Sequence, residues 1–134
     1  MAIDPRSDRP VYRQLADLLH DEISTGRLAP DTLLPSETQL VTRYKVGREA
    51  VRQAVAVLRA EGLVRTERGV GTRVRRPADR VPVTLGSGDT ALARMPSLRE
   101  RREYDLDEGV PVIEVRRAGG TVEIHAGDRT EIAG

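Results

Sequence analysis

The stretch VGREAVRQAVAVL, residues 46–58, places four polar side chains in the first turns of a candidate helix. These side chains are Arg48, Glu49, Arg52 and Gln53. An arginine can donate two hydrogen bonds to a guanine, a glutamine can pair with an adenine, and a carboxylate can accept a hydrogen bond from a cytosine. The chemistry that these residue types offer together is hydrogen bonding to the edges of bases in a DNA groove.

The opposite side of the same stretch is apolar, with Val51, Ala54, Val55 and Leu58 at helical spacing. The four polar side chains and Ala56 share the other side, because successive residues lie about 100° apart around a helix. A recognition helix meets base edges with its outer side near the N-terminus, and a helix N-terminus also favours a phosphate. The alternative is an ordinary amphipathic helix whose charged side faces water.

Two helices are expected before this one. Val11, Leu15, Leu18, Leu19 and Ile23 recur at helical spacing and Gly26 follows, which predicts a helix over about residues 10–25. Residues 36–39 read Ser-Glu-Thr-Gln, a capping box, and predict a short helix over 36–44. The short connection RYKVG lets this helix cross the third helix, 48–61, at a steep angle, so one face of the third helix stays outside the core.

A basic hairpin is expected after the third helix, which ends at Gly62. LVRTER and TRVRR are strand-like stretches on either side of GVG, and Arg65, Arg68, Arg73, Arg75 and Arg76 lie along them. Gly69 and Gly71 permit positive φ and close backbone approach. Arg68 at the tip is expected to enter a minor groove, while Arg65, Arg73 and Arg75 are expected to meet phosphates. Helix, helix, turn, helix and hairpin in this order predict a winged helix-turn-helix in an α+β chain.

Composition limits the classes of protein to consider. Residues 1–80 contain 15 Lys and Arg against 11 Asp and Glu, whereas residues 81–134 contain 7 against 10, and a basic end suits a polyanion. There is no cysteine, which excludes disulfides and thiolate metal sites. No apolar stretch approaches the ~18 residues of a membrane span, so a cytoplasmic protein is expected. The only aromatic residues are three Tyr, so the core must be aliphatic and small, and a dimer partner would add to it.

The C-terminal part is expected to be an appendage. A second capping box, Ser-Leu-Arg-Glu at 97–100, predicts a short helix to about Tyr104, and a second hairpin turns at Gly119–Gly120. A lone hairpin buries little, so it must pack on the N-terminal domain, pair with another copy or remain loosely ordered. Pairing in a dimer is favoured, through Ile113, Val115, Val122 and Ile124. A small-molecule effector is disfavoured, because a pocket needs walls that this segment lacks.

Residues 11–74 resemble the N-terminal DNA-binding domain of the GntR family of bacterial transcription regulators. The resemblance rests on the Pro-Ser-Glu step into the second helix, the GREAVR start of the third, EGLV, and the G-x-G-T wing. It implies that Arg48 and Arg52 contact base edges or nearby phosphates, and that Arg68 and Gly69 form the wing tip. The DNA-binding set expected from the residues and the resemblance is Ser36, Thr38, Arg48, Glu49, Ala50, Arg52, Gln53, Arg68, Gly69 and Gly71.

The chain departs from the family pattern at three places. Thr38 stands where members often have an arginine, so it can contact a phosphate but supplies no charge. Gly47 stands where a Ser or Thr is common, which gives up a side-chain cap at a cost of roughly a few tenths of a kcal/mol. Glu49 and Ala50 lie where members often have Thr. Because Glu49 is a negative group facing a negative groove, we expect it to act through selectivity.

Residues 91–129 resemble the start of the UbiC transcription regulator-associated domain, the effector domain of the HutC-type branch of that family. The matching stretch is ARMPSLRERREYDLDEGVPVIEVRRAGG, followed by a strand and HAGDR. A complete copy is much longer, so the resemblance implies a truncated effector domain. The expected organisation is a winged helix-turn-helix domain at 1–76, a linker at 77–90 with a possible short strand at 82–85, and the truncated segment at 91–134.

Two other classes of function are weighed against regulation. An enzyme is disfavoured, because His20 is more typical of a helix surface than of a base, and a lone pair such as His125 and Asp128 in a hairpin is more often structural. No phosphate loop, metal-ligand cluster or nucleophile elbow occurs, so no cofactor or metal is expected. The alternative is a winged-helix module that binds another regulator instead of DNA. The sequence favours a transcription regulator, a repressor that binds a pseudo-palindromic operator in double-stranded DNA as a homodimer, with half-sites about one helical turn apart.

Overall fold

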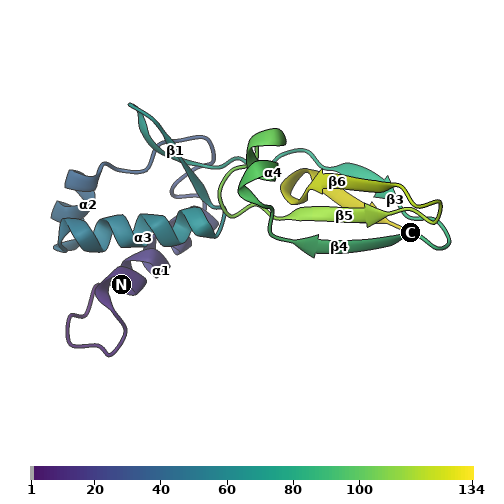
Figure 1. Ribbon diagram of the computed structural model, residues 1–134. Helices are drawn as coiled ribbons and strands as arrows, with labels where there is room; N and C mark the ends of the chain where they lie inside the picture. Colours follow the sequence, from purple (N-terminus) through teal and green to yellow (C-terminus); the bar gives the residue numbers. More distant parts are fainter. Residues whose placement is uncertain (1) are drawn as a thin grey trace. The chain divides into compact units, whose positions relative to one another are not determined.

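The computed structural model describes residues 2–134 and divides into two compact units, Met1–Arg76 and Pro77–Gly134, with Met1 itself outside the described residues. Figure 1 shows the helical first unit in purple to teal and the strand-rich second unit in green to yellow. Among residues 2–134, no helix has both the length and the apolar content that crossing a membrane requires.

Three helices and a hairpin form the first unit. The helices are α1 at Val11–Ser24, α2 at Glu37–Tyr44 and α3 at Arg48–Ala60, and the hairpin strands are β1 at Val64–Glu67 and β2 at Gly71–Val74. The predicted winged helix-turn-helix is therefore confirmed. Each helix boundary lies within one residue of its expected position, because the boundaries are set by local chemistry that the sequence displays.

The turn between α2 and α3 is tight at both of its ends. At the start of α2, Gln39 N donates to Ser36 Oγ at 3.1 Å and Ser36 N donates to Gln39 Oε1 at 2.8 Å, which is the predicted capping box. The helix ends at Tyr44, and its capping residue Lys45 has a left-handed φ of 55°. Gly47 then begins α3 without a side-chain cap. Only two residues separate the end of one helix from the cap of the next, so the turn fixes how α3 lies against α2.

The apolar side of α3 packs against the rest of the first unit. Its buried residues Val51, Ala54 and Leu58 share one cluster with Leu15 and Leu19 of α1, Leu40 of α2 and Val64 and Val74 of the hairpin. These buried side chains are all aliphatic, as the composition predicts. Burial of this stripe leaves the opposite side of α3 at the surface.

The hairpin gains a third, irregular strand from the loop before α2. Leu33 forms a bridge with Arg73 of β2, and Leu34 N donates to the carbonyl oxygen of Thr72 at 2.7 Å. The sequence predicts only a loop over residues 27–35. Its pairing with β2 covers one edge of the wing, and an edge strand is otherwise open to pairing with another chain.

The second unit contains six elements of regular structure and a 3₁₀ turn. They are β3 at Val81–Thr84, β4 at Thr90–Arg94, α4 at Leu98–Glu103, β5 at Val112–Arg116, β6 at Val122–Ala126, η1 at Gly127–Arg129 and β7 at Thr130–Ala133. Strands β4, β5 and β6 form an antiparallel sheet in that order, and β3 pairs with β7 in parallel. Residues 77–90, expected as a linker, thus include a paired strand.

The expectation of a lone C-terminal hairpin is wrong. The hairpin of β5 and β6 does turn around Gly119–Gly120, but β4 pairs along the other edge of β5, and β7 follows β6. The sequence hides β4 because residues 90–93 are exposed on both of its faces, so no apolar alternation marks it. It hides the pairing of β3 with β7 because the two strands lie far apart in the chain, and local patterns do not name a distant partner.

The four residues expected at a dimer contact have different environments. Val115 is fully buried, Ile113 and Ile124 are half-buried, and Val122 is 53% exposed. Ile124 packs against the buried cluster of this unit that contains Val112. Val115 therefore has no surface to offer a second chain while this unit is folded, and only Val122 of the four is mainly exposed.

The capping box of α4 also meets an arginine. Glu100 N donates to Ser97 Oγ at 3.1 Å, and two nitrogens of the Arg94 guanidinium donate to the Glu100 carboxylate, each at 2.8 Å. The Arg94 guanidinium, followed by the backbone N–H of Ser97, lowers the pKa of Glu100 from 4.5 to about 2.

We expect this pKa shift to make the second unit less stable in acid. The folded-state pKa lies below the unfolded-state value, so the carboxylate stabilises the fold above about pH 4.5 and loses its contribution as the pH falls toward 2. The melting temperature, followed by NMR signals of residues 97–116 in the full chain, should fall over this range. Glu100→Gln removes the charge but preserves the capping hydrogen bonds, and it should flatten the fall. An unaltered pH dependence in this variant would contradict the role of the ion pair.

Candidate nucleic-acid interface

The outward side of α3 presents the polar residues of its first turns at the surface. Arg48, Glu49, Arg52 and Gln53 are all exposed, whereas Val51 between them is buried. The side chains of Arg48 and Arg52 are 56% and 63% exposed. The helix is thus divided into an apolar and a polar side as its periodicity predicts.

A carboxylate from α2 holds both arginines. Glu37 Oε1 accepts from Arg48 Nη1 at 3.1 Å and from Arg52 Nη2 at 3.2 Å, and Glu37 Oε2 accepts from Arg52 Nε at 3.1 Å. Arg48 Nη2 also donates to Thr38 Oγ1 at 3.2 Å. The two guanidinium groups therefore lie together on one flank of α3, against the first turn of α2.

These contacts balance the charge of the first turns of α3. The Arg52 guanidinium, and after it that of Arg48, lowers the pKa of Glu37, while Glu37 raises the pKa of Arg52. Two arginines are thus offset by Glu37 and Glu49. The surface offers oriented hydrogen-bond donors and acceptors more than bulk positive charge.

Glu37 is the residue of this surface that sequence reasoning missed. It stands in the Pro-Ser-Glu step, directly after the capping serine, where an acidic residue is expected to favour the helix N-terminus. Because this local explanation is sufficient, the sequence gives no sign that Glu37 also binds the two arginines of α3. Its reach to Arg48 and Arg52 depends on how α2 crosses α3, which periodicity along one helix does not determine.

The wing is held together by its own charged residues. Glu67 Oε1 accepts from Arg73 Nε at 2.6 Å and from Arg65 Nη2 at 3.2 Å. Arg73 Nη1 also donates to the carbonyl oxygen of Asp31 at 2.7 Å. The side chain of Arg73 is only 27% exposed. Arg73, expected to meet a phosphate, thus ties β2 to β1 and to the loop before α2.

The tip of the wing differs from its stem. In the stem, Arg75 Nη1 donates to the carbonyl oxygen of Gly62 at 2.8 Å, so this arginine also supports the fold. At the tip, Arg68 is exposed and makes no ion pair or side-chain hydrogen bond within residues 2–134. Gly69 and Gly71 have φ values of 75° and 144°, which favour glycine. Arg68 is therefore the cation that the wing leaves available.

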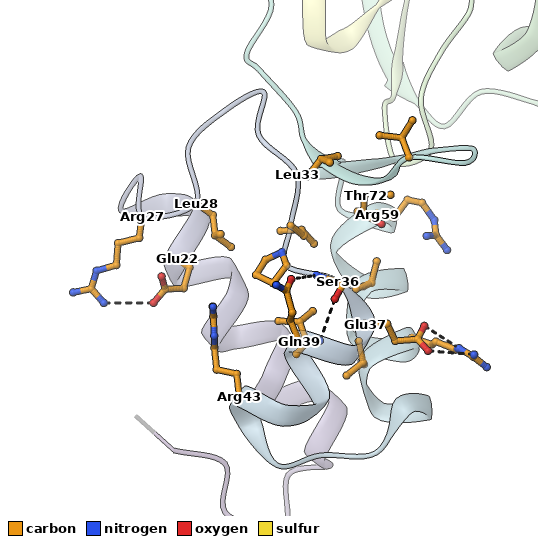
Figure 2. A pocket seen from close by; sticks show the side chains of 18 residues that line it. Glu22, Arg27, Leu28, Leu33, Ser36, Glu37, Gln39, Arg43, Arg59 and Thr72 are labelled. Carbon is orange, nitrogen blue, oxygen red and sulfur yellow. Dashed lines mark hydrogen bonds and ion pairs between the residues drawn. The ribbon is translucent and has the colours of Figure 1, made fainter.

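A hollow of about 1150 Å³ lies between α2, α3 and the hairpin (Figure 2). Figure 2 shows Glu37 with its ion pairs on one side of it, and Leu33 of the loop before α2 with Thr72 of the wing on another. Leu33 and Val70 are 41% and 57% exposed. The polar turns of α3 and the wing thus border one concave surface.

The two histidines make local contacts. His20 Nδ1 lies 3.3 Å from Ser24 Oγ one turn along α1, and His125 Nε2 lies 2.9 Å from Glu123 Oε1 on the same strand. Within residues 2–134, no group of three His, Cys, Asp or Glu side chains is placed to hold a metal ion.

Comparison with known proteins points to one family. Residues 11–74, which include α1 to β2, match the family described as bacterial regulatory proteins, gntR family. The HTH-type transcriptional repressor NagR of Bacillus subtilis (strain 168) is 39% identical over 77 residues, which make up 58% of this chain and 32% of NagR. The chain spans about a third of the length of the first curated relatives that it matches.

Two solved structures are similar to the chain. YtrA from Sulfolobus acidocaldarius, a GntR-family transcription factor, is 31% identical with a TM-score of 0.52, and the similarity covers 55% of this chain and 78% of YtrA. AraR(DBD) in complex with operator ORX1 is 30% identical with a TM-score of 0.50, over 55% of this chain and 92% of that one. Because the family match spans the whole winged helix-turn-helix and a member aligns over most of its own length, the chain belongs to the gntR family of bacterial regulatory proteins.

Proposed function

We propose that the chain is a sequence-specific DNA-binding regulator of transcription that reads its site with the first turns of α3. The observation that carries the proposal is the exposed set of Arg48, Glu49, Arg52 and Gln53, on a helix whose other side is committed to the core. Family membership supports it, as does the similarity to the AraR domain in complex with an operator.

In this proposal the N-terminal half of α3 enters the major groove. Arg48 and Arg52 exchange Glu37 for the O6 and N7 atoms of guanines, and Gln53 faces the neighbouring base pair. The ion pairs with Glu37 reach solvent and are therefore weak, so their exchange for a base is not a large barrier. Until then Glu37 keeps both guanidinium groups ordered.

The flanking elements contact the backbone. Ser36 Oγ already accepts a hydrogen bond from Gln39 N, so its hydroxyl proton remains to donate to a phosphate. Thr38 is also exposed, and its Oγ1 accepts from Arg48 Nη2, so its hydroxyl proton can be donated to a phosphate in the same way. At the wing, Gly69 and Gly71 allow close approach and Arg68 enters the adjacent minor groove.

We further infer a homodimer that acts in the cytoplasm as a repressor. A two-fold dimer matches a pseudo-palindromic operator whose half-sites lie about one helical turn apart. The similarity to NagR, which is named a repressor, supports repression. We also propose that the second unit is a truncated effector domain of the HutC-type branch.

Selection from a randomised duplex library by the full chain, at two salt concentrations, tests the proposal. We expect one pseudo-palindromic site to be enriched, and the logarithm of its binding constant to fall linearly with the logarithm of the salt concentration. The double variant Arg48→Ala/Arg52→Ala should enrich no site. If the wild-type chain enriches no site and its DNA binding is insensitive to salt, the winged helix serves a protein partner instead.

Glu49 is expected to set the ranking of sites more than the overall affinity. Its exposed carboxylate makes no hydrogen bond within residues 2–134, repels phosphates and can accept from a cytosine amino group. Glu49→Thr should remove a preference of about 1–3 kcal/mol at one position of each half-site in the library. Glu61→Thr, at the C-terminal end of α3, changes the net charge equally and should leave the ranking intact. Identical relative affinities in wild type and Glu49→Thr would refute this role.

A further inference from the structure

Residues 2–9 form an arm before α1 that is hydrogen-bonded to this helix. Gln14 Nε2 donates to the carbonyl oxygens of Asp4 and Arg9 at 2.9 and 2.8 Å, and Gln14 Oε1 accepts from Asp4 N at 2.8 Å. The Arg9 guanidinium donates twice to the Asp17 carboxylate, at 2.8 and 3.0 Å. These contacts give the arm a fixed path.

The path leads the arm to the first turn of α3. A hollow of about 770 Å³ is lined by Ala2, Ile3 and Pro5 of the arm, by residues 43–47 at the end of α2 and in the turn, and by Ala50 of α3. Ile3 also packs against the buried cluster of the first unit. The arm is therefore part of the same folded unit as the recognition surface.

The arm and the N-terminal turn of α2 lie on opposite flanks of the outward side of α3. At 3.6 residues per turn, Ala50 lies about 160° around the helix from Arg52, with Glu49 and Gln53 between them. Arg52 contacts Glu37 of α2, whereas Ala50 lines the hollow beside the arm. The two phosphate backbones border the major groove on either side of a helix that lies in it. The arm thus lies on the flank of α3 that is opposite Glu37.

Cations without an ion pair lie in the arm and around this hollow. The Arg6 side chain is exposed and makes no ion pair within residues 2–134, although its backbone N–H donates to Asp4 Oδ1 at 2.9 Å. Over the same described residues, Arg43 and Lys45 also make no ion pair, and both line the hollow. The Asp8 carboxylate of the arm also makes no ion pair within residues 2–134, so its negative charge partly offsets these cations.

We propose that the arm is a second phosphate-binding element, in which Arg6 contacts the DNA backbone on the flank of α3 opposite Glu37. This inference rests on the proposed function, since it requires α3 in the major groove. The hydrogen bonds of Gln14 fix the arm before DNA arrives, so less conformational freedom is lost when Arg6 binds. The contact is electrostatic and is independent of base sequence.

The test measures the dissociation constant of the full chain for its selected site at several salt concentrations. Arg6→Ala should reduce the slope of log K against log salt by about 0.9 for each bound chain, the value for one phosphate contact, and so by about 1.8 for the proposed dimer. It should weaken binding of an unrelated duplex by the same factor. Arg6→Lys keeps the charge and should keep the slope. In Gln14→Leu, which releases the arm, adding Arg6→Ala should change the slope less than it does in the wild type.

A charge-matched variant separates contact from long-range attraction. Arg6→Ala/Asp8→Asn has the net charge of the wild type, and its slope should stay reduced if Arg6 touches a phosphate. Recovery of the wild-type slope in this variant would overturn the proposal, as would an unaltered slope in Arg6→Ala. If the wild-type chain selects no site at all, the proposed function fails instead, so the two failures are distinguishable.

Discussion

Replacing Arg52 with alanine is expected to weaken binding of the selected site by about 1–3 kcal/mol per half-site, roughly 5- to 150-fold for each, and to relax the preference at one base pair of each half-site. The reason is the guanidinium fork, which can donate to guanine O6 and N7 together. The side chain is 63% exposed and is held only by Glu37, so its removal leaves the core untouched. Fluorescence anisotropy on the site and its single-base variants measures both effects.

The lysine variant at the same position separates charge from geometry. Arg52→Lys keeps a positive charge but loses the planar fork, so it should keep binding to unrelated DNA and lose the preference for one base. Circular dichroism should show the same melting temperature for all three proteins. If Arg52→Ala weakens the selected site and unrelated DNA by one common factor, Arg52 is a phosphate contact and does not read a base.

Replacing Leu58 with alanine is expected to lower the free energy of unfolding of the first unit by about 2–5 kcal/mol. Leu58 is fully buried and lies in the cluster that joins α3 to α1 and to the hairpin. The loss combines the transfer free energy of the removed atoms with the cavity they leave. It is a large fraction of the ~5–15 kcal/mol by which whole domains are stable. Urea unfolding followed by circular dichroism measures it.

A surface variant serves as the reference for this change. Val70 lies in the wing, is 57% exposed, and should lose less than about 0.5 kcal/mol on replacement by alanine. Leu58→Ala should also bind DNA less well at temperatures where it is partly unfolded, and regain binding on cooling. A loss below about 1 kcal/mol for Leu58→Ala would show that α3 is not anchored by this cluster.

The first unit was predictable because its boundaries and its core depend on local chemistry. The serine and glutamine of the α2 capping box are three residues apart, and the buried residues of α3 repeat at helical spacing. The side of α3 that faces away from the core follows from the same spacing. None of these inferences requires knowledge of which elements meet.

The parts that could not be predicted all depend on contacts between distant residues. Glu37 reaches Arg52 across 15 positions, and Arg73 reaches the Asp31 carbonyl across 42. Both pairings depend on how elements cross, so spacing along the sequence does not predict the contacts by which Arg73 supports the wing. In the second unit, β4 has no buried face, so the sequence predicts a lone hairpin where a three-stranded sheet forms. The parallel pairing of β7 with β3 joins strands that are distant in the sequence, so local patterns do not predict it either.

The first turns of α3 are nearly neutral, so hydrogen bonding to bases and general attraction to DNA fall to different surfaces of the first unit. Glu37 and Glu49 offset the two arginines, so this surface favours correct hydrogen bonding over general attraction to DNA. Attraction must then come from cations beside it, among them Arg68 of the wing and Arg6 of the arm. We therefore expect specificity and salt dependence to be altered by different substitutions.

Guanine N7 substitution tests the central claim, that the arginines of α3 read bases, most directly. Affinities of wild type, Arg48→Ala and Arg52→Ala are measured for the selected site with 7-deazaguanine at each guanine in turn, which removes the N7 acceptor. We expect that one substitution in each half-site weakens binding by the wild type but leaves the affinity of one of the two variants unaffected. If every 7-deazaguanine substitution affects the wild type and both variants equally, neither arginine reads a guanine in the major groove and the account is wrong.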